Sequence, residues 1–261
     1  MARTYKEVIV GGIKIACLTR HDLAALMVEE CHAARRTPGR PPRLVDAANG
    51  NAIARAAVDA DFRNHFQAAD IIHADGLPVV LASRLLTKAP IPERSATTDY
   101  FLDAAAAAEA NGFSFFLLGG SESVNARCAE ILRQRYPGLR IAGRRHGYFA
   151  HEEEAAVCEE INASGADVVW VGLGVPLEQS FCARNKARLR AGWLVTCGGC
   201  FNYVTGDYPR APLWMQQTGL EWLFRLLHEP RRLFWRYAVT NPQAIFLMLT
   251  RTVSQPVVTA A

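Results

Sequence analysis

Short apolar runs with the character of β-strands alternate with amphipathic stretches of helical length along most of this 261-residue chain. The strand-like runs are VIVGGIKIA (8–16), RLVDAAN (43–49), ADIIHAD (69–75), FSFFLLGG (113–120), LRIAGRR (139–145), ADVVWVGLG (166–174) and WLVTCGG (193–199). Strands that are separated by helices pair in parallel, because the helix supplies the crossover that a parallel connection needs. The pattern therefore predicts an α/β fold, with a Rossmann-like, mainly parallel sheet and helices on both faces.

The residue composition and the spacing of apolar residues change after Asn202. From about residue 203 the strand-like runs stop, and Tyr, Trp, Arg and Pro recur at helical spacing. We therefore divide the chain into a Rossmann-like catalytic core, residues 1–202, and a helical appendage, residues 203–261. Within the appendage, GLEWLFRLLHEPRRLFWRYA (219–238) contains five large aromatics and four arginines.

Composition narrows the class of protein. Half of the residues are apolar, 21% are charged and the net charge is +4, which is typical of a globular protein and argues against a nucleic-acid partner. The N-terminus lacks the apolar core and cleavage site of a secretory signal. No run of about 18 apolar residues is present, AIFLML at 244–249 being far too short. These features predict a cytoplasmic chain that does not cross a membrane.

The seven cysteines are scattered along the chain and odd in number, as is usual for small apolar residues in a reducing compartment. Cys197 and Cys200 form a C-x-x-C without a second pair or nearby histidines. Packing at the exit of a strand is therefore favoured over zinc binding.

Ligands of open α/β sheets bind beyond the carboxyl ends of the strands, where loops present N–H groups and helix N-termini. Asp75, followed by Gly76, ends one strand and is a candidate general base, with a turn or helix-capping aspartate as the alternative. Gly119 and Gly120 precede Ser121, which is typical of a helix start. This second loop is suited to a diphosphate, or is a plain strand-to-helix turn.

A third loop carries Gly172 and Gly174, with Pro176 placed to start a helix. Glu178 and Gln179 then fall in the first helical turn and face the same edge, although polar residues are also ordinary helix starters. Neither glycine loop has the G-x-G-x-x-G spacing that a nicotinamide dinucleotide favours.

Taken together and in order, the motifs resemble a known family. The segments ADGLPVVLASRLL, FFLLGGSESVNARCAEILRQRYPGLRIAGRRHGYF, DVVWVGLGVPLEQ and RAPLWMQQTGLEWLFRLLHEPRRLFWRY are similar to those of the WecG/TagA/CpsF family of bacterial glycosyltransferases. The resemblance runs from about residue 8 to about residue 245. Its RAP-x-W, GLEW-x-x-R-L and EP-x-R elements together are highly specific.

The resemblance implies an inverting enzyme of surface or exopolysaccharide synthesis. Such an enzyme moves a sugar from a nucleotide donor, usually a UDP-sugar, to a polyprenyl-diphosphate-linked sugar at the cytoplasmic membrane face, without a tightly bound metal. The base aspartate of the family falls on Asp75, and its strand-end asparagine falls on Asn49.

Three positions depart from the family pattern. The usual P-x-Q-E reads Pro176-Leu177-Glu178-Gln179, a frequent threonine is replaced by Ala47, and F-D is replaced by Phe201-Asn202. The departures are compatible with a subgroup that uses another sugar or with a weakened enzyme. The catalytic candidates are Asp75, Asn49, Glu178 and Gln179.

An inverting transfer needs a base for the acceptor hydroxyl and cations or N–H dipoles for the departing diphosphate. Pro230 is placed to start a helix on which Arg232 and Arg236 lie four residues apart, on one face. The predicted substrate ligands are Gly76, Gly119, Gly120, Gly172, Gly174, Arg210, Arg225, Arg231, Arg232 and Arg236, and no metal is expected. The aromatics beside these arginines suit a bilayer interface, the alternative being core packing with solvated arginines.

Two other classes of protein stay open on the sequence. One is a nucleotide-cofactor oxidoreductase, and the other is a noncatalytic, membrane-associated polysaccharide assembly protein. For the enzyme we expect a UDP-sugar, a polyprenyl-diphosphate acceptor and an anionic membrane surface as partners. The expected location is peripheral, on the inner face of the bacterial cell membrane. A closed homo-oligomer is the common default.

Overall fold

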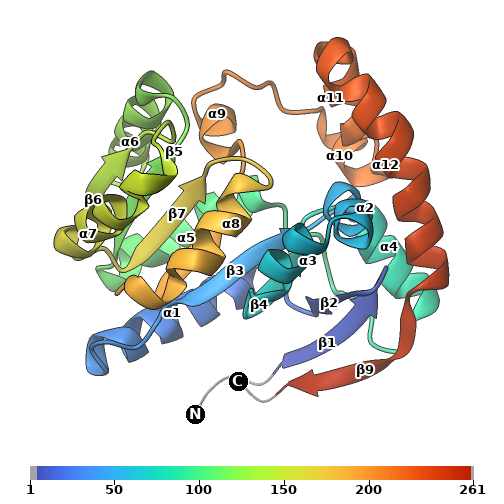
Figure 1. Ribbon diagram of the computed structural model, residues 1–261, viewed down its shortest axis with the longest axis horizontal. Coiled ribbons are helices and arrows are strands. Elements are labelled where there is room, and N and C mark those ends of the chain that lie inside the picture. The colour runs from blue at the N-terminus through green and yellow to red at the C-terminus, as the bar shows by residue number, and fades with distance from the viewer. Residues whose placement is uncertain (1–4, 260–261) are drawn as a thin grey trace.

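Six parallel strands form the central sheet of the protein, in a computed structural model that describes residues 5–259 (Figure 1). The strands are β3 (Arg43–Ala48), β4 (Ile71–Ala74), β5 (Ser114–Gly119), β6 (Arg140–Arg145), β7 (Val168–Gly172) and β8 (Trp193–Thr196). They lie in the order β4-β3-β8-β7-β5-β6, and every neighbouring pair is parallel. The predicted α/β fold with a mainly parallel sheet is confirmed, and the carboxyl ends of the strands meet at one edge.

Side chains of the strands alternate between two apolar layers, as the period of two in a β-strand requires. Phe115 and Leu117 of β5 pack with one cluster, whereas Phe116 and Leu118 pack with the other. The first layer is covered by α1 (Arg20–Arg36), α5 (Thr97–Asn111) and α6 (Glu122–Arg135). The second is covered by α7 (Glu154–Ser164) and α8 (Leu177–Asn185), with the short 3-10 turns η1 (His151–Glu153) and η2 (Lys186–Arg188) beside them.

Local signals set several of these helix ends. The predicted helix start at Ser121 is confirmed, because its hydroxyl accepts from the Val124 N–H at 3.2 Å. Thr19 and Asp22 form a capping box at the start of α1. Gly112 ends α5 with a φ of 64°, a conformation that glycine adopts without strain.

The first strand-like run does not join the parallel sheet. Residues 8–16 fold as a hairpin of β1 (Tyr5–Val10) and β2 (Ile13–Ala16), which are antiparallel. Gly11 and Gly12 form its turn, with φ of 61° and 82°, as the twist of a two-residue hairpin turn requires. The Gly-Gly pair inside the apolar run was the signal for this turn.

The C-terminal region contains four helices and one strand. They are α9 (Cys200–Val204), α10 (Leu213–Thr218), α11 (Glu221–His228), α12 (Pro230–Thr250) and β9 (Val253–Thr259). The expectation that strands stop near residue 203 was wrong, because β9 pairs antiparallel with β1 in a second sheet of order β2-β1-β9.

Helix α12 has two different halves. Its second half buries Ala244, Leu247 and Met248 against a third apolar cluster, which also contains the hairpin, α2 (Gly50–Val58), α3 (Ala60–Gln67) and α4 (Leu77–Leu86). Its first half carries Phe234 and Trp235, which are exposed. None of the helices within the described residues is both long enough and apolar enough to span a bilayer. The appendage is therefore part core and part surface.

Candidate active site

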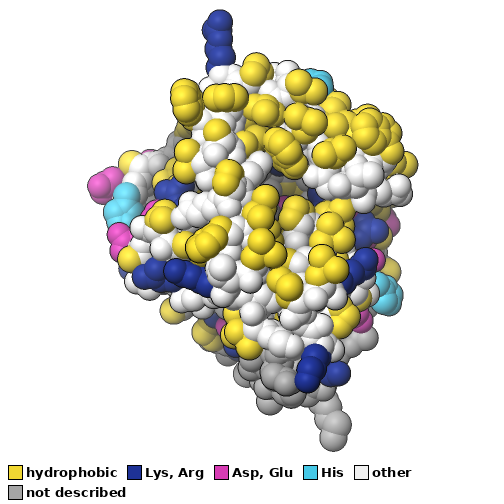
Figure 2. All heavy atoms as spheres, turned by 90° about the vertical axis from the view of Figure 1, so that its right-hand side faces the viewer, with side chains coloured by type: hydrophobic (Ala, Val, Ile, Leu, Met, Phe, Trp, Pro, Cys, Tyr) yellow, Lys and Arg dark blue, Asp and Glu magenta, His cyan; other side chains and the backbone are white. Residues whose placement is uncertain are grey.

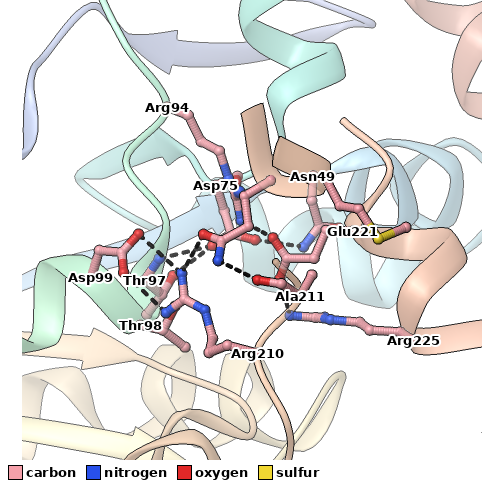
Figure 3. A network of polar contacts seen from close by, with 12 residues as sticks. Asn49, Asp75, Arg94, Thr97, Thr98, Asp99, Arg210, Ala211, Glu221 and Arg225 are labelled. Carbon is pink, nitrogen blue, oxygen red and sulfur yellow. Dashed lines mark hydrogen bonds and ion pairs between the residues drawn. The ribbon is translucent and has the colours of Figure 1, made fainter. Parts of the chain in front are cut away.

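Asp75 lies at the carboxyl edge of the sheet, directly after β4 (Figure 3). Its backbone N–H donates to the Ala48 carbonyl at 2.9 Å, which ties the loop to the end of β3. One carboxylate oxygen accepts from the Thr97 N–H at 2.8 Å and its hydroxyl at 3.2 Å. The other accepts from the Asn49 side-chain amide at 3.4 Å. Two of the predicted catalytic residues, Asp75 and Asn49, are thus in contact.

Asn49 has a second bond that orients it. It is the N-cap of α2, and its side-chain oxygen accepts from the Ala52 N–H at 3.1 Å, so its amide nitrogen points to Asp75. Gly76 packs against the same residue, because a Cβ on Gly76 would lie 3.2 Å from the Asn49 Cβ. Gly76 therefore allows the ends of β3 and β4 to come close together.

The environment of Asp75 favours its ionised form. Burial raises the pKa of the Asp75 carboxyl, but Arg94, the Thr97 N–H and Arg225 lower it more, so that it lies below its ordinary value. His73 lies two residues earlier and is fully buried, and burial lowers its pKa to about 4. At neutral pH the site therefore holds a carboxylate beside a neutral imidazole.

Arg94 was not predicted from the sequence, and it binds the Asp75 loop directly. Its Nε donates to the Asp75 carbonyl at 2.7 Å, and its Nη2 donates to Glu221 of α11 at 2.6 Å. Arg94 precedes α5 by three positions in PERSATTD, a loop that follows the Asp75 motif in the chain. An arginine in a loop at the ligand edge was the available signal.

Two of the predicted phosphate ligands come from the appendage and lie in the same network (Figure 3). Arg225 of α11 donates to Glu221 at 2.9 Å and lies over the Tyr203 ring at 5.1 Å. Arg210 donates to Thr98 at 2.8 Å and forms an ion pair with Asp99 at 2.9 Å, both in the first turn of α5. The appendage therefore brings two guanidinium groups to the part of the edge that holds Asp75.

The other three predicted arginines lie elsewhere. Arg231, Arg232 and Arg236 are exposed on the first half of α12, which begins at Pro230 as predicted. Arg232 pairs with Glu229 at 2.7 Å, and Arg236 lies over the Tyr237 ring at 5.2 Å. No contact described in the structure joins these three to Asp75.

The backbone N–H groups of the two glycine loops are used largely for hydrogen bonds within the protein. The Gly120 N–H donates to the Gly172 carbonyl at 3.1 Å, and a Cβ on Gly119 would lie 2.2 Å from that same oxygen. The Gly174 N–H donates to Glu178 at 3.0 Å. We expected these loops to cradle a diphosphate, but the N–H groups of Gly120 and Gly174 already have acceptors within the protein. The N-terminus of α6, directly after Gly120, remains on this edge with its positive dipole end.

Glu178 and Gln179 are buried, and no hydrogen bond described in the structure joins them to Asp75. One Glu178 oxygen accepts from the N–H groups of Gly174 and Gly198, at 3.0 and 2.9 Å, and so joins the loops after β7 and β8. The Gln179 amide donates to Asp46 at 3.2 Å, and Asp46 also accepts from Thr196 at 2.7 Å. We expected both residues to point toward the crevice, but both are buried, and the Gly174 N–H, the Gly198 N–H and Asp46 bind them inside. The side-chain oxygen of Gln179 has no hydrogen-bond partner among the described residues.

Two buried carboxyl groups therefore share this cluster. Burial raises the pKa of Glu178 to about 8, with the negative charge of Asp46 adding to the shift. Burial also raises the pKa of Asp46 to about 6, although its bonds from Thr196 and the Ala47 N–H oppose the shift. The pair carries less than two negative charges at neutral pH, and its geometry is that of a structural cluster.

Asp59, just before α3, is engaged by groups of the protein. Asp59 and Asp61 give a D-x-D sequence, but Asp59 caps α3 through the Phe62 N–H at 2.9 Å and pairs with Arg55 at 3.2 Å. Among the residues that the structure describes, no three His, Cys, Asp or Glu side chains come together as metal ligands. Cys197 and Cys200 are buried and free, as packing residues are.

An open parallel sheet with a fixed carboxylate and guanidinium groups at its carboxyl edge is the architecture of an enzyme that acts on anionic, phosphate-bearing substrates. The model of the Glycosyl transferase WecG/TagA/CpsF family matches residues 8–257 of the chain. The chain belongs to this family and is a glycosyltransferase. Family membership decides against the oxidoreductase and against the noncatalytic assembly protein.

A relative from Bacillus spizizenii (strain ATCC 23059 / NRRL B-14472 / W23) supports the assignment. The chain is 33% identical over 181 residues to its N-acetylglucosaminyldiphosphoundecaprenol N-acetyl-beta-D-mannosaminyltransferase. The match covers 69% of this chain and 68% of the relative. The predicted resemblance to the WecG/TagA/CpsF family is therefore confirmed.

Proposed function

We propose that the protein transfers a sugar from a UDP-sugar to a polyprenyl-diphosphate-linked sugar, with inversion at the anomeric carbon. The observation that carries the proposal is the ionised Asp75 carboxylate at the sheet edge, beside the guanidinium groups of Arg94 and Arg225. The name of the relative, which is a transferase for a sugar on diphosphoundecaprenol, supports the class of acceptor.

The proposed reaction is a single displacement. The acceptor hydroxyl attacks the anomeric carbon of the donor while Asp75 takes the hydroxyl proton, and the bond from that carbon to the diphosphate oxygen breaks. The leaving UDP takes the electron pair, and its growing negative charge is stabilised by Arg94, Arg225 and Arg210. Asn49 and Thr97 hold the base in one orientation throughout, because each donates to a different oxygen of Asp75.

The arginines also supply a reason to expect no divalent metal. A guanidinium fork binds phosphate oxygens in two places and remains charged at any physiological pH. We expect UDP to bind with the same affinity in the presence of a chelator and in the presence of magnesium, as measured by calorimetry. A strict requirement for magnesium or manganese would contradict the proposed mechanism.

The appendage is proposed to bring the protein to its lipid-linked acceptor. The face formed by α10, α11, α12 and α4 carries many hydrophobic side chains (Figure 2). The exposed large hydrophobic side chains of α10, α11 and α12 are Leu213, Trp214, Trp222, Leu227, Phe234, Trp235, Val239, Ile245, Phe246 and Leu249. Arg231, Arg232 and Arg236 lie on the same helix as several of them and suit anionic headgroups or the lipid diphosphate. We propose peripheral attachment to the inner face of the bacterial cell membrane.

A direct assay tests the transfer. Purified protein is incubated with a panel of UDP-sugars and a short-chain polyprenyl-diphosphate-sugar acceptor, and the products are weighed by mass spectrometry. The expected result is one added sugar with one of the donors, with UDP released in equal amount. Binding of UDP without product from any donor would contradict the proposed donor and acceptor pair.

A further inference from the structure

The arginines around Asp75 have carboxylate neighbours within the protein without any ligand. Three guanidinium groups, of Arg94, Arg210 and Arg225, face three carboxylates, of Asp75, Asp99 and Glu221. The arginines that are proposed to stabilise a diphosphate are therefore already neutralised by residues of the protein. A diphosphate that enters this network has to compete with one of the three carboxylates.

Glu221 is the carboxylate best placed for such a competition. It is the first residue of α11, and one of its oxygens lies 2.6 Å from Arg94 Nη2 while the other lies 2.9 Å from Arg225 Nη2. Its side chain is 13% exposed, so the pairing is largely shielded from water. Glu221 thus bridges an arginine of the core and an arginine of the appendage, in the way that an oxyanion of a substrate would.

The bridge leaves guanidinium donors without partners. The Nε of Arg225 and the Nε of Arg210 are buried and have no hydrogen-bond acceptor among the described residues. Such donors are costly to leave unpaired. A diphosphate has more acceptor oxygens than a carboxylate and at least two negative charges, so it can satisfy donors that Glu221 does not reach.

We propose that Glu221 is an internal counter-anion that occupies the phosphate-binding arginines in the free protein and competes with the diphosphate of the substrate. The inference rests on the proposed function for the identity of the diphosphate as that of UDP. Glu221 holds Arg94 and Arg225 side by side when no substrate is bound. Its charge lowers the affinity of the site for the UDP product, which favours release.

Neutralising Glu221 tests the competition. In Glu221→Gln, the two guanidinium groups lose their counter-anion, so binding of both UDP and inorganic pyrophosphate should tighten by about three- to thirtyfold. Calorimetry with each ligand measures the change. Glu130→Gln, on the exposed surface of α6, makes the same change in net charge and should leave both affinities within about twofold, since a charge exposed at the surface is screened. Unchanged or weaker binding in Glu221→Gln would overturn the proposal.

A second variant tests whether the contact of Glu221 with both arginines matters in addition to its negative charge. Glu221→Asp keeps the negative charge but is one methylene shorter, so its carboxylate no longer reaches both guanidinium groups in the present backbone. It should also bind UDP and pyrophosphate more tightly than the wild type, though less so than the glutamine variant. If the glutamine variant fails to fold, this variant alone decides, and affinity equal to or below that of the wild type overturns the proposal.

Comparing UDP with pyrophosphate distinguishes a failure of the Glu221 proposal from a failure of the proposed UDP-sugar donor. If the wild type binds UDP and neither variant binds it more tightly, Glu221 is structural and the proposed function stands. If pyrophosphate shows the expected order of affinities but UDP does not bind, Glu221 competes as proposed and the donor is wrong. If neither ligand binds to any of the three proteins, both proposals fail.

Discussion

Several hydrogen bonds hold Asp75 in one position, and its surroundings favour the ionised form of its carboxyl group. Its two oxygens receive bonds from Thr97 and Asn49, and Arg94 binds its carbonyl, so neither its position nor its charge depends on substrate. A carboxylate whose pKa lies below the ordinary value is a weak base, and it accepts the proton only as the acceptor oxygen forms its new bond. This fits a single displacement, in which proton transfer and attack proceed together.

Asp75→Asn should remove most turnover, leave folding nearly unchanged and bind UDP at least as tightly as the wild type. The amide cannot take a proton, and a general base typically contributes about a hundred- to ten-thousandfold in rate. Turnover is measured by product mass, folding by circular dichroism and UDP affinity by calorimetry. Wild-type turnover in the variant would exclude Asp75 as the base.

Glu178→Gln should stabilise the protein increasingly as the pH rises. The pKa of Glu178 is raised to about 8 by burial, above its ordinary value of 4.5, so its contribution to stability is fully present below about pH 4.5 and is lost as the pH rises through about 8. Glutamine keeps an oxygen that accepts from Gly174 and Gly198, and it is also the residue that the family pattern has here. The gain over the wild type should grow from pH 5 to pH 9, to on the order of 1–4 kcal/mol.

Urea unfolding at several pH values measures this gain. Glu159→Gln, a change of the same kind at an exposed position of α7, is the control and should show no growth with pH. A gain in Glu178→Gln that is constant from pH 5 to pH 9 would show that Glu178 stays ionised in the folded protein.

At the scale of elements, the ends of β5 and β7 lie so close together that a residue with a Cβ does not fit at Gly119. Gly119 has a φ of 131° and lies against the Gly172 carbonyl, and Gly172 in turn lies against the Gly198 carbonyl. Three neighbouring strand ends are thereby held together at the ligand edge. The α6 N-terminus depends on this arrangement for its position.

Gly119→Ala should be strongly destabilising, by about 3 kcal/mol or more, because the added Cβ would lie 2.2 Å from the Gly172 oxygen. Gly174→Ala is the matched control. Gly174 also has a positive φ, of 79°, but its Cβ would meet nothing within 4 Å, so the cost should be about 1–2 kcal/mol. Thermal unfolding compares the two, and equal losses would contradict the close-approach argument.

At the scale of the whole molecule, the C-terminal region closes the fold as well as the site. Its β9 pairs with β1, and α12 buries Ala244, Leu247 and Met248 in a cluster that contains the N-terminal hairpin. Removal of residues 203–261 would expose this cluster, so truncation would not separate membrane attachment from stability. Point substitutions on the exposed half of α12 do separate them.

Replacing both Phe234 and Trp235 by serine should weaken binding to anionic liposomes by about tenfold or more and leave thermal stability nearly unchanged. Their side chains are 52% and 73% exposed, so the fold loses little, whereas membrane contact loses two interfacial aromatics. Tyr148→Ser, in the loop after β6, is the control, since Tyr148 is 78% exposed and lies outside the appendage. Cosedimentation measures binding, and undiminished binding of the double variant would show that this face does not meet the membrane.

The sequence alone determined what depends on local periodicity and local caps. Apolar runs of strand length predicted all six parallel strands, and Ser121 and Pro230 marked two helix starts. The position of Asp75 after β4 predicted a carboxylate at the carboxyl edge, because that edge follows from parallel strands whatever their order. The family resemblance rested on the same local strings.

Only the tertiary structure decided the partners of these residues. Arg94 and Glu221 lie 127 positions apart in the chain, and no period or motif relates them. Glu178 reads as a solvent-facing residue of a first helical turn, yet two N–H groups from separate loops make its burial possible. The partner of β9 is β1, from the opposite end of the chain. Such pairings depend on which strands and helices become neighbours, and that is set by packing of the whole molecule rather than by sequence nearby.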